Sequence, residues 1–253
     1  MSGHSKWAQI KRQKSVADAR RGQLFTKLAR EITIAARDGG SDPEANPRLR
    51  LAIQRARDNN MPAENIERAI KRATGGTEAA SLTEITLEGY GPGGAAILLQ
   101  VVTDNRNRTL AEIRSIFTRN NASLGESGCV TWLFDHKGVI SIEAGDNAEE
   151  LALLAIDAGA DDVKVEDNFV QIYTKPDDLE SVRKELEGKG VKITSAELSL
   201  IPQNLVKLDE KSALQNLKLL DRLEELDEVQ HVFTNADFPE EVIESYRSKA
   251  AIS

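Results

Sequence analysis

Residues 84–102 have the sequence EITLEGYGPGGAAILLQVV and mark the point at which the chain changes from helix to strand. Ile85 and Leu87 alternate with polar residues, and Ala95–Val102 is an almost continuous apolar run, so we predict two strands here. The glycines of Gly89–Gly94 between them predict a tight connection. The pattern therefore predicts an α+β fold from this stretch onward.

The same glycines raise the possibility of a nucleotide site. Gly89-x-Gly91-x-x-Gly94 matches the dinucleotide-binding pattern by letter, but that site needs a helix directly after the glycines. A predicted strand follows instead, and Pro92 removes one amide donor. We interpret the segment as a glycine-rich loop between strands, which could still approach a ligand closely.

The residues before this stretch predict three helices, because apolar residues such as Leu24, Leu28 and Ile32 recur every four positions. The capping residue Asn46 and Pro47 in the first turn are typical of a helix start. The predicted helices extend from about Val16 to Arg37 with a stop at Gly39-Gly40, onward from Asn46-Pro47, and from Met61-Pro62 to Gly75-Gly76.

The residues after Val102 predict a helix from about Arg108 to Asn120 and a half-buried strand in which Val130, Trp132 and Phe134 alternate with Thr131 and Leu133. The order strand, helix, strand, strand, helix, strand follows, which is the ferredoxin-like motif. Its predicted elements are Val139–Ile142, Ala148–Ala158, Val163–Val165, Phe169–Tyr173, Leu179–Leu186 and Ile193–Leu200.

A helix at Ala213–Leu226 and a strand at Val229–Phe233 have no partners of their own, so we expect this strand to return to the sheet begun at Ile85. A short helix or tail at Pro239–Lys249 ends the chain. The predicted domains are residues 1–76, residues 77–135 plus 204–253, and an inserted ferredoxin-like domain at 136–203.

The composition and the motifs argue against several classes of protein. Cys129 is the only cysteine, so no intramolecular disulfide can form, as is typical of a reducing compartment. The N-terminus lacks the apolar stretch of a secretory signal, and no apolar run approaches the roughly 20 residues of a membrane span. No P-loop, zinc-ligand spacing or catalytic constellation is present. We expect a cytoplasmic protein without a cofactor, a metal, a catalytic residue or a membrane partner.

Charge is distributed unequally along the chain. Residues 1–76 contain 16 lysines and arginines and 8 acidic residues, a net charge of +8, whereas residues 77–253 contain 17 and 33, a net charge of −16. Such a division indicates a basic surface for a polyanion on an otherwise acidic protein. A solvated face of ordinary N-terminal helices is the alternative.

Two basic patterns favour the polyanion. Six cations lie within 16 positions near the N-terminus, with Trp7 offering a face for an unpaired base. In the second helix, four arginines line both edges of the predicted buried stripe, more than snorkelling around a core requires. The candidate nucleic-acid-binding residues are Lys6, Trp7, Lys11, Arg12, Lys14, Arg20, Arg21, Arg48, Arg50, Arg55 and Arg57, and a possible secondary basic surface comprises Arg106, Arg108, Arg114 and Arg119.

With these motifs the sequence resembles the YebC/PmpR family over nearly its whole length. The segments that carry the resemblance are Ser2–Trp7 with Ile10-Lys11, Phe25–Ile32, Asn46–Arg50, Asn59–Pro62, Glu88–Gly94, and Gly138 after Trp132–Phe134. The resemblance implies a crescent-like protein with a helical N-terminal domain and two α+β domains, without a cofactor or enzymatic activity. It also implies a probable transcriptional regulator that binds DNA, while mitochondrial members are translational activators and bacterial members are linked to ribosomes stalled on proline-rich sequences.

The functional hypothesis is therefore a non-enzymatic regulator of gene expression that binds DNA or ribosomal RNA, with the ribosome as one expected site of action. No helix pattern argues for reading duplex DNA by sequence, so an extended arm entering RNA suits the N-terminal residues at least as well. Two alternatives remain open: an enzyme that uses the Gly89–Gly94 loop with Tyr90 and Asp104, and an adaptor whose acidic ferredoxin-like domain binds a basic protein. The sequence does not indicate the oligomeric state.

Overall fold

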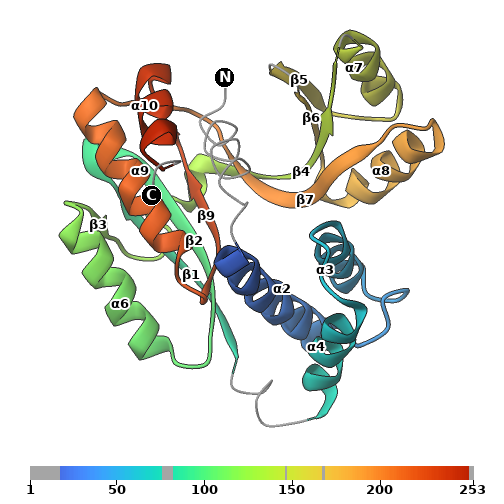
Figure 1. Ribbon diagram of the computed structural model, residues 1–253, viewed down its shortest axis with the longest axis horizontal. Coiled ribbons are helices and arrows are strands. Elements are labelled where there is room, and N and C mark those ends of the chain that lie inside the picture. The colour runs from blue at the N-terminus through green and yellow to red at the C-terminus, as the bar shows by residue number, and fades with distance from the viewer. Residues whose placement is uncertain (1–17, 76–81, 146, 167–168, 251–253) are drawn as a thin grey trace.

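A computed structural model describes residues 18–75, 82–145, 147–166 and 169–250. Figure 1 shows a group of helices, a sheet covered by helices on one side, and a second sheet with helices of its own, and we call these three parts lobes. Each lobe has its own cluster of buried apolar side chains. The predicted α+β fold class is confirmed, whereas the predicted domain boundaries stay a prediction.

The helical lobe consists of α2 (Asp18–Gly39), α3 (Pro47–Asp58) and α4 (Ala63–Gly75). The predicted cap is present, because the Asn46 side chain accepts a hydrogen bond from the Leu49 amide at 3.1 Å. The predicted apolar stripe of α3 packs against α2 and α4. The buried residues of this core include Leu28, Ile32, Leu49, Ala52, Ile53, Ala56 and Ile66.

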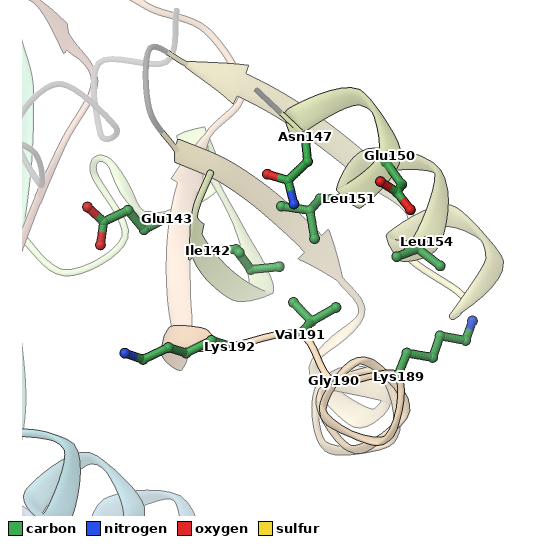
Figure 2. Close-up of a pocket in the computed structure, with 10 residues that line it drawn as sticks. All are labelled: Ile142, Glu143, Asn147, Glu150, Leu151, Leu154, Lys189, Gly190, Val191 and Lys192. Atoms are coloured by element: carbon green, nitrogen blue, oxygen red, sulfur yellow. The ribbon is translucent and has the colours of Figure 1, made fainter. Parts of the chain in front are cut away.

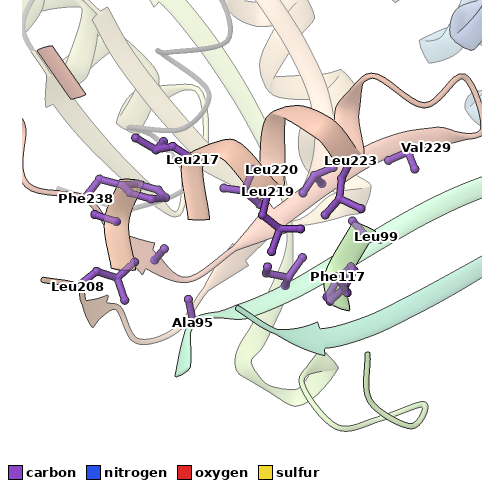
Figure 3. Close-up of a cluster of buried hydrophobic side chains, with 14 of the residues drawn as sticks. Ala95, Leu99, Phe117, Leu208, Leu217, Leu219, Leu220, Leu223, Val229 and Phe238 are labelled. Carbon is purple, nitrogen blue, oxygen red and sulfur yellow. The ribbon is translucent and has the colours of Figure 1, made fainter. Parts of the chain in front are cut away.

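The first sheet has the strand order β3-β1-β2-β9 and is antiparallel. Its strands are β1 (Thr83–Tyr90), β2 (Ala96–Thr103), β3 (Ser123–Leu124) and β9 (Val229–Thr234). One face packs against helices α6 (Arg106–Arg119) and α9 (Glu210–Glu224), with α10 (Glu240–Ala250) beside α9. Figure 3 shows the resulting core, in which leucines of α9 lie over Leu99 and Phe117. A short pair, β8 (Val206–Lys207) and β10 (Ala236–Asp237), flanks it.

The second sheet belongs to a ferredoxin-like unit, as predicted. Its order β5-β6-β4-β7 is antiparallel throughout, and α7 and α8 pack on one face. The elements are β4 (Phe134–Glu143), α7 (Ala148–Asp157), β5 (Asp162–Glu166), β6 (Phe169–Thr174), a 3-10 turn η3 (Pro176–Asp178), α8 (Leu179–Gly188) and β7 (Ile193–Pro202). Ile140 opposite Ile172 and Ile142 opposite Val170 form the center of its core.

The chain leaves the first sheet after β3, forms the whole second sheet, and returns as β9 beside β2. This return confirms the predicted pairing of the strand at Val229–Phe233 with the sheet begun at Ile85. One unit is thereby inserted in the other, which matches the predicted fold class.

One predicted strand is wrong. Residues Val130–Phe134 do not form an alternating strand: Thr131–Leu133 is a 3-10 turn, η2, and β4 begins only at Phe134. The amides of Val130 and Thr131 both donate to one carboxylate oxygen of Glu88, at 2.8 and 2.9 Å. Consecutive amides of an extended strand point in opposite directions, so this contact requires a turn. Trp132 consequently faces solvent rather than a core.

The glycine-rich connection packs tightly against α9. It forms a 3-10 turn, η1 (Pro92–Gly94), in which Gly93 has φ 76° and Gly94 has φ 80°, values that favour glycine. Asn216 of α9 is fully buried and donates to the Pro92 carbonyl at 2.7 Å, and its oxygen lies where a Cβ on Gly91 would sit. The loop is therefore a packing element of the first sheet.

Candidate nucleic-acid interface

The structure places the predicted basic residues in different environments. Lys6, Trp7, Lys11, Arg12 and Lys14 lie outside the described residues. Arg20 and Arg21 lie near the start of α2, and Arg21 is exposed. The arginines of α3 and α6 can each be located, and their partners separate them into two groups.

Arg48 and Arg50 are bound to neighbouring segments. Arg48 forms an ion pair with Glu84 of β1 at 2.8 Å and lies 3.8 Å from Asp38. Arg50 donates to the backbone carbonyls of Pro43 at 3.0 Å and Glu44 at 2.8 Å. These contacts fasten α3 to the first sheet and to the turn that precedes it. They leave less of each guanidinium free for a phosphate.

Arg55 lies at the junction of all three lobes. Its Nη1 is 3.0 Å from a carboxylate oxygen of Glu31 in α2 and 3.0 Å from Nε2 of His231 in β9, and its Nε is 3.8 Å from Glu197 of β7. Because a guanidinium only donates, Nε2 of His231 accepts this hydrogen bond. Burial alone would lower the pKa of Arg55, but the carboxylates of Glu31, Glu197 and Glu224 outweigh burial and raise it.

Further contacts brace the helical lobe against the first sheet. Arg30 of α2 lies 3.8 Å from Glu228, and Lys27 and Gln23 donate to the backbone carbonyls of Glu224 and Glu225. Leu51 of α3 packs against the core of the ferredoxin-like unit. Arg55 and its neighbours therefore hold the lobes together, and these contacts leave less of the Arg55 guanidinium available for a phosphate.

Other cations are exposed and have no ion pair with any residue in the described part of the chain. In the helical lobe these are Arg57, Lys71 and Arg72. In α6 they are Arg106, Arg114 and Arg119, whereas Arg108 is paired with Asp104 at 2.8 Å and Glu228 at 3.3 Å. Cations without a carboxylate partner are the ones that remain available to neutralise phosphates.

Sequence reasoning missed a loop that the structure makes prominent. Glu88 of β1 is almost fully buried and accepts amide hydrogen bonds from Gly128, Val130 and Thr131 at 2.7–2.9 Å. Burial alone would raise the pKa of Glu88, but these hydrogen bonds outweigh burial and lower it. In the sequence, Glu88 comes directly after the alternating apolar and polar residues of β1. Nothing in the sequence distinguishes it from a glutamate that faces solvent.

This arrangement predicts a pH-dependent effect of Glu88→Gln. The amide retains one acceptor but places its NH2 group against an amide donor, so we expect a loss of about 2 kcal/mol of unfolding free energy at pH 7. A carboxylate with a lowered pKa stabilises the fold above its unfolded pKa, and this contribution disappears as the pH falls. The difference between the two proteins should therefore shrink below about pH 4.

Urea unfolding of both proteins across pH measures this difference. Glu126→Gln, in the same loop but exposed, is the matched control and should change stability by less than about 0.5 kcal/mol. Equal stability of wild type and Glu88→Gln at pH 7 would contradict the role given to Glu88.

A pocket of about 300 Å³ lies in the ferredoxin-like unit, far along the chain from the glycine loop. Figure 2 shows the side chains of Ile142, Leu151 and Val191 pointing toward one another, with Glu143 and Lys192 turned away from them. Among the described residues, no three His, Cys, Asp or Glu side chains are grouped so as to hold a metal ion.

Cys129 is partly buried, and its pKa is raised by burial and by Glu88, which keeps the thiol protonated at neutral pH. The described helices include none long and apolar enough to cross a membrane.

Together, the fold and its charges define a three-lobed α+β protein with a cationic helical lobe braced against two acidic units. Family models match this chain in both parts: the TACO1/YebC N-terminal domain at residues 5–76, and the TACO1/YebC second and third domains at residues 82–236. The chain belongs to the TACO1/YebC family.

Individual relatives agree over the full length. A protein of Dehalococcoides mccartyi strain 195 named probable transcriptional regulatory protein DET0444 is 58% identical over 251 residues, covering 99% of this chain and 100% of that protein. A probable transcriptional regulatory protein of Halothermothrix orenii is 52% identical, covering 96% and 98%. The crystal structure of a conserved hypothetical protein, Aq1575 from Aquifex aeolicus, matches with a TM-score of 0.82 and 48% identity over 88% of this chain and 93% of that one.

Proposed function

We propose that this protein is a non-enzymatic regulator of gene expression that binds nucleic acid through its basic N-terminal residues. The observation that carries the proposal is the net charge of +8 over residues 1–76, in a chain whose relatives are named probable transcriptional regulatory proteins. Lysines and arginines that neutralise phosphates release counterions, which supplies most of the binding free energy without sequence preference.

The proposed contact residues combine the N-terminal cations found in the sequence with cations that are exposed in the structure. They are Lys6, Trp7, Lys11, Arg12, Lys14, Arg20 and Arg21, joined by the exposed cations Arg57, Lys71 and Arg72 and, on a secondary surface, Arg106, Arg114 and Arg119. Arg48 and Arg50 contribute less, because Glu84 and backbone carbonyls already engage them. The acidic remainder of the chain attracts a polyanion less than these residues do, so we expect most phosphate contacts to involve them.

RNA, including ribosomal RNA, is the second candidate partner beside duplex DNA. A helix that reads the major groove presents side chains along one exposed face. In α3, by contrast, three of the four arginines contact neighbouring parts of the protein. This observation favours an unpaired or irregular nucleic acid over a duplex read by sequence, and so supports a role in translation.

The enzyme alternative has less support. It requires room for a small molecule at Gly89–Gly94, and that loop is packed against Asn216 and Leu208. The Tyr90 hydroxyl donates a hydrogen bond to the Cys129 carbonyl, and Asp104 forms an ion pair with Arg108. Neither side chain is aimed at a shared reacting position, so no catalytic role is proposed for them.

Crosslinking in living cells tests the proposal. Ultraviolet crosslinking of the full chain, followed by sequencing of the attached nucleic acid, should recover nucleic acid well above the level of a variant in which Lys6, Lys11, Arg12 and Lys14 are alanine. Recovery of ribosomal RNA supports the translational form, and recovery of promoter DNA supports the transcriptional form. Equal recovery from wild type and variant would contradict the proposed contact residues.

A further inference from the structure

Two aromatic side chains are exposed at one place on the surface. Trp132 in η2 has 66% of its surface exposed, and Tyr90 at the end of β1 has 37%. Single exposed apolar side chains are common on protein surfaces, but adjacent ones form a patch of the kind that marks an interaction site. Two neighbouring exposed aromatic rings therefore point to a candidate binding surface.

Both rings are anchored by their polar ends to the same atom. The Tyr90 hydroxyl donates to the backbone oxygen of Cys129 at 2.9 Å, and the Trp132 indole nitrogen donates to that oxygen at 3.1 Å. A shared anchor holds the two side chains close together and fixes how they are turned. Since the protein already satisfies both polar groups, what remains for a partner is the flat, apolar surface of the rings.

The loop that carries Trp132 is rigidly mounted. The Glu88 carboxylate holds the amides of Gly128, Val130 and Thr131, and the Gly125 amide donates to the Glu88 carbonyl at 2.8 Å. Val130 is fully buried in a cluster with Leu98 and Phe233 of the first sheet. Binding of a partner to the rings therefore does not cost the conformational entropy of ordering the loop, which favours binding.

We propose that Trp132 and Tyr90 form a stacking platform for an unpaired nucleobase. The inference rests on the proposed nucleic-acid function and adds a second kind of contact to its phosphate contacts. Every base has a π-face, so stacking on an aromatic side chain tolerates any sequence. With the indole N–H and phenol O–H both engaged by Cys129, the rings stack rather than read base edges, and a base inside a duplex has no free face to offer.

Tryptophan fluorescence can test this directly, because the chain has two tryptophans. Trp7→Phe leaves Trp132 as the sole tryptophan and preserves an aromatic ring at position 7. In that background, a short single-stranded oligothymidylate or oligouridylate should quench the emission saturably, and a covalently closed circular duplex, which has no terminal base face, should not. In the otherwise wild-type chain, Trp132→Ala should weaken binding of the single strand by roughly 5-fold to 150-fold, as expected for the loss of one stacked base.

Two controls separate stacking from charge and from folding. Trp132→Phe should retain most of the affinity, because a phenyl ring still stacks. Trp132→Ala should leave unchanged both the melting temperature and the slope of log K against log salt, since it removes no phosphate contact.

The outcomes distinguish the inference from the function on which it rests. Salt-dependent binding by the wild type, with unquenched Trp132 emission and unchanged affinity of Trp132→Ala, would overturn the platform alone and leave the exposed rings for a protein partner. Absence of binding to every single-stranded and duplex probe would overturn the proposed function together with the platform.

Discussion

Replacing Lys6, Lys11, Arg12 and Lys14 with alanine is expected to weaken nucleic-acid binding by about 100-fold or more at low salt. Each cation that neutralises a phosphate contributes counterion release, and the four together remove most of the basic charge at the N-terminus. Fluorescence anisotropy with a labelled single strand and a labelled duplex measures the loss. The bracing contacts described above, such as Arg30 with Glu228 and Arg55 with Glu31, are made by other residues, so we expect the variant to fold, and its melting temperature checks this.

A matched control separates local from overall charge. Lys175, Lys192, Lys207 and Lys211 are exposed and lie outside the basic segment, so their replacement by alanine changes the net charge by the same amount. This control should lower the affinity only slightly, through the long-range field. Equal losses in the two variants would mean that net charge, and not the N-terminal residues, governs binding.

Arg55→Met is expected to lower the unfolding free energy by about 3 kcal/mol. The thioether keeps the apolar length of the side chain but leaves Glu31 and Glu197 without their shared cation and His231 without its donor. Removing one partner of a largely buried ion pair typically destabilises by about 3–5 kcal/mol, and we take the lower end because 22% of the Arg55 side chain is exposed. Urea unfolding monitored by circular dichroism measures the change.

Arg57→Met is the control for this experiment. Arg57 lies two positions further along α3, is exposed, and has no ion pair with any residue the structure describes. Its replacement should change stability by less than about 0.5 kcal/mol while weakening nucleic-acid binding modestly. Equal stability of the two variants would contradict the bracing role of Arg55.

Most helices and strands of the fold could be predicted because local sequence patterns determine them. The Asn46-Pro47 start of α3, the ferredoxin-like order of β4 to β7, and the return of β9 to β2 each follow from spacing or from the need to pair a strand. The segment at Val130–Phe134 was predicted wrongly because its alternation is typical of a strand, while a buried carboxylate 42 positions earlier in the chain draws its amides into a turn.

The candidate site was less predictable, for a related reason. An arginine at the edge of an apolar stripe has the same sequence signature whether it meets a phosphate or a carboxylate. Arg55 and Arg57 share that signature, yet Arg55 meets His231, 176 positions away, and Arg57 faces solvent. The exposed position of Trp132 was hidden in the same way, because only the tertiary contact with Glu88 turns it outward.

The dependence of binding on salt tests the central claim most directly. The six cations Lys6, Lys11, Arg12, Lys14, Arg20 and Arg21 should together contribute about −4 to −5 to the slope of log K against log salt for the wild type, and each further phosphate contact should make the slope steeper by slightly less than 1. The variant lacking the first four should show a slope less steep by about 3. A wild-type slope near zero, or the same slope in both proteins, would contradict a nucleic-acid interface built on these residues.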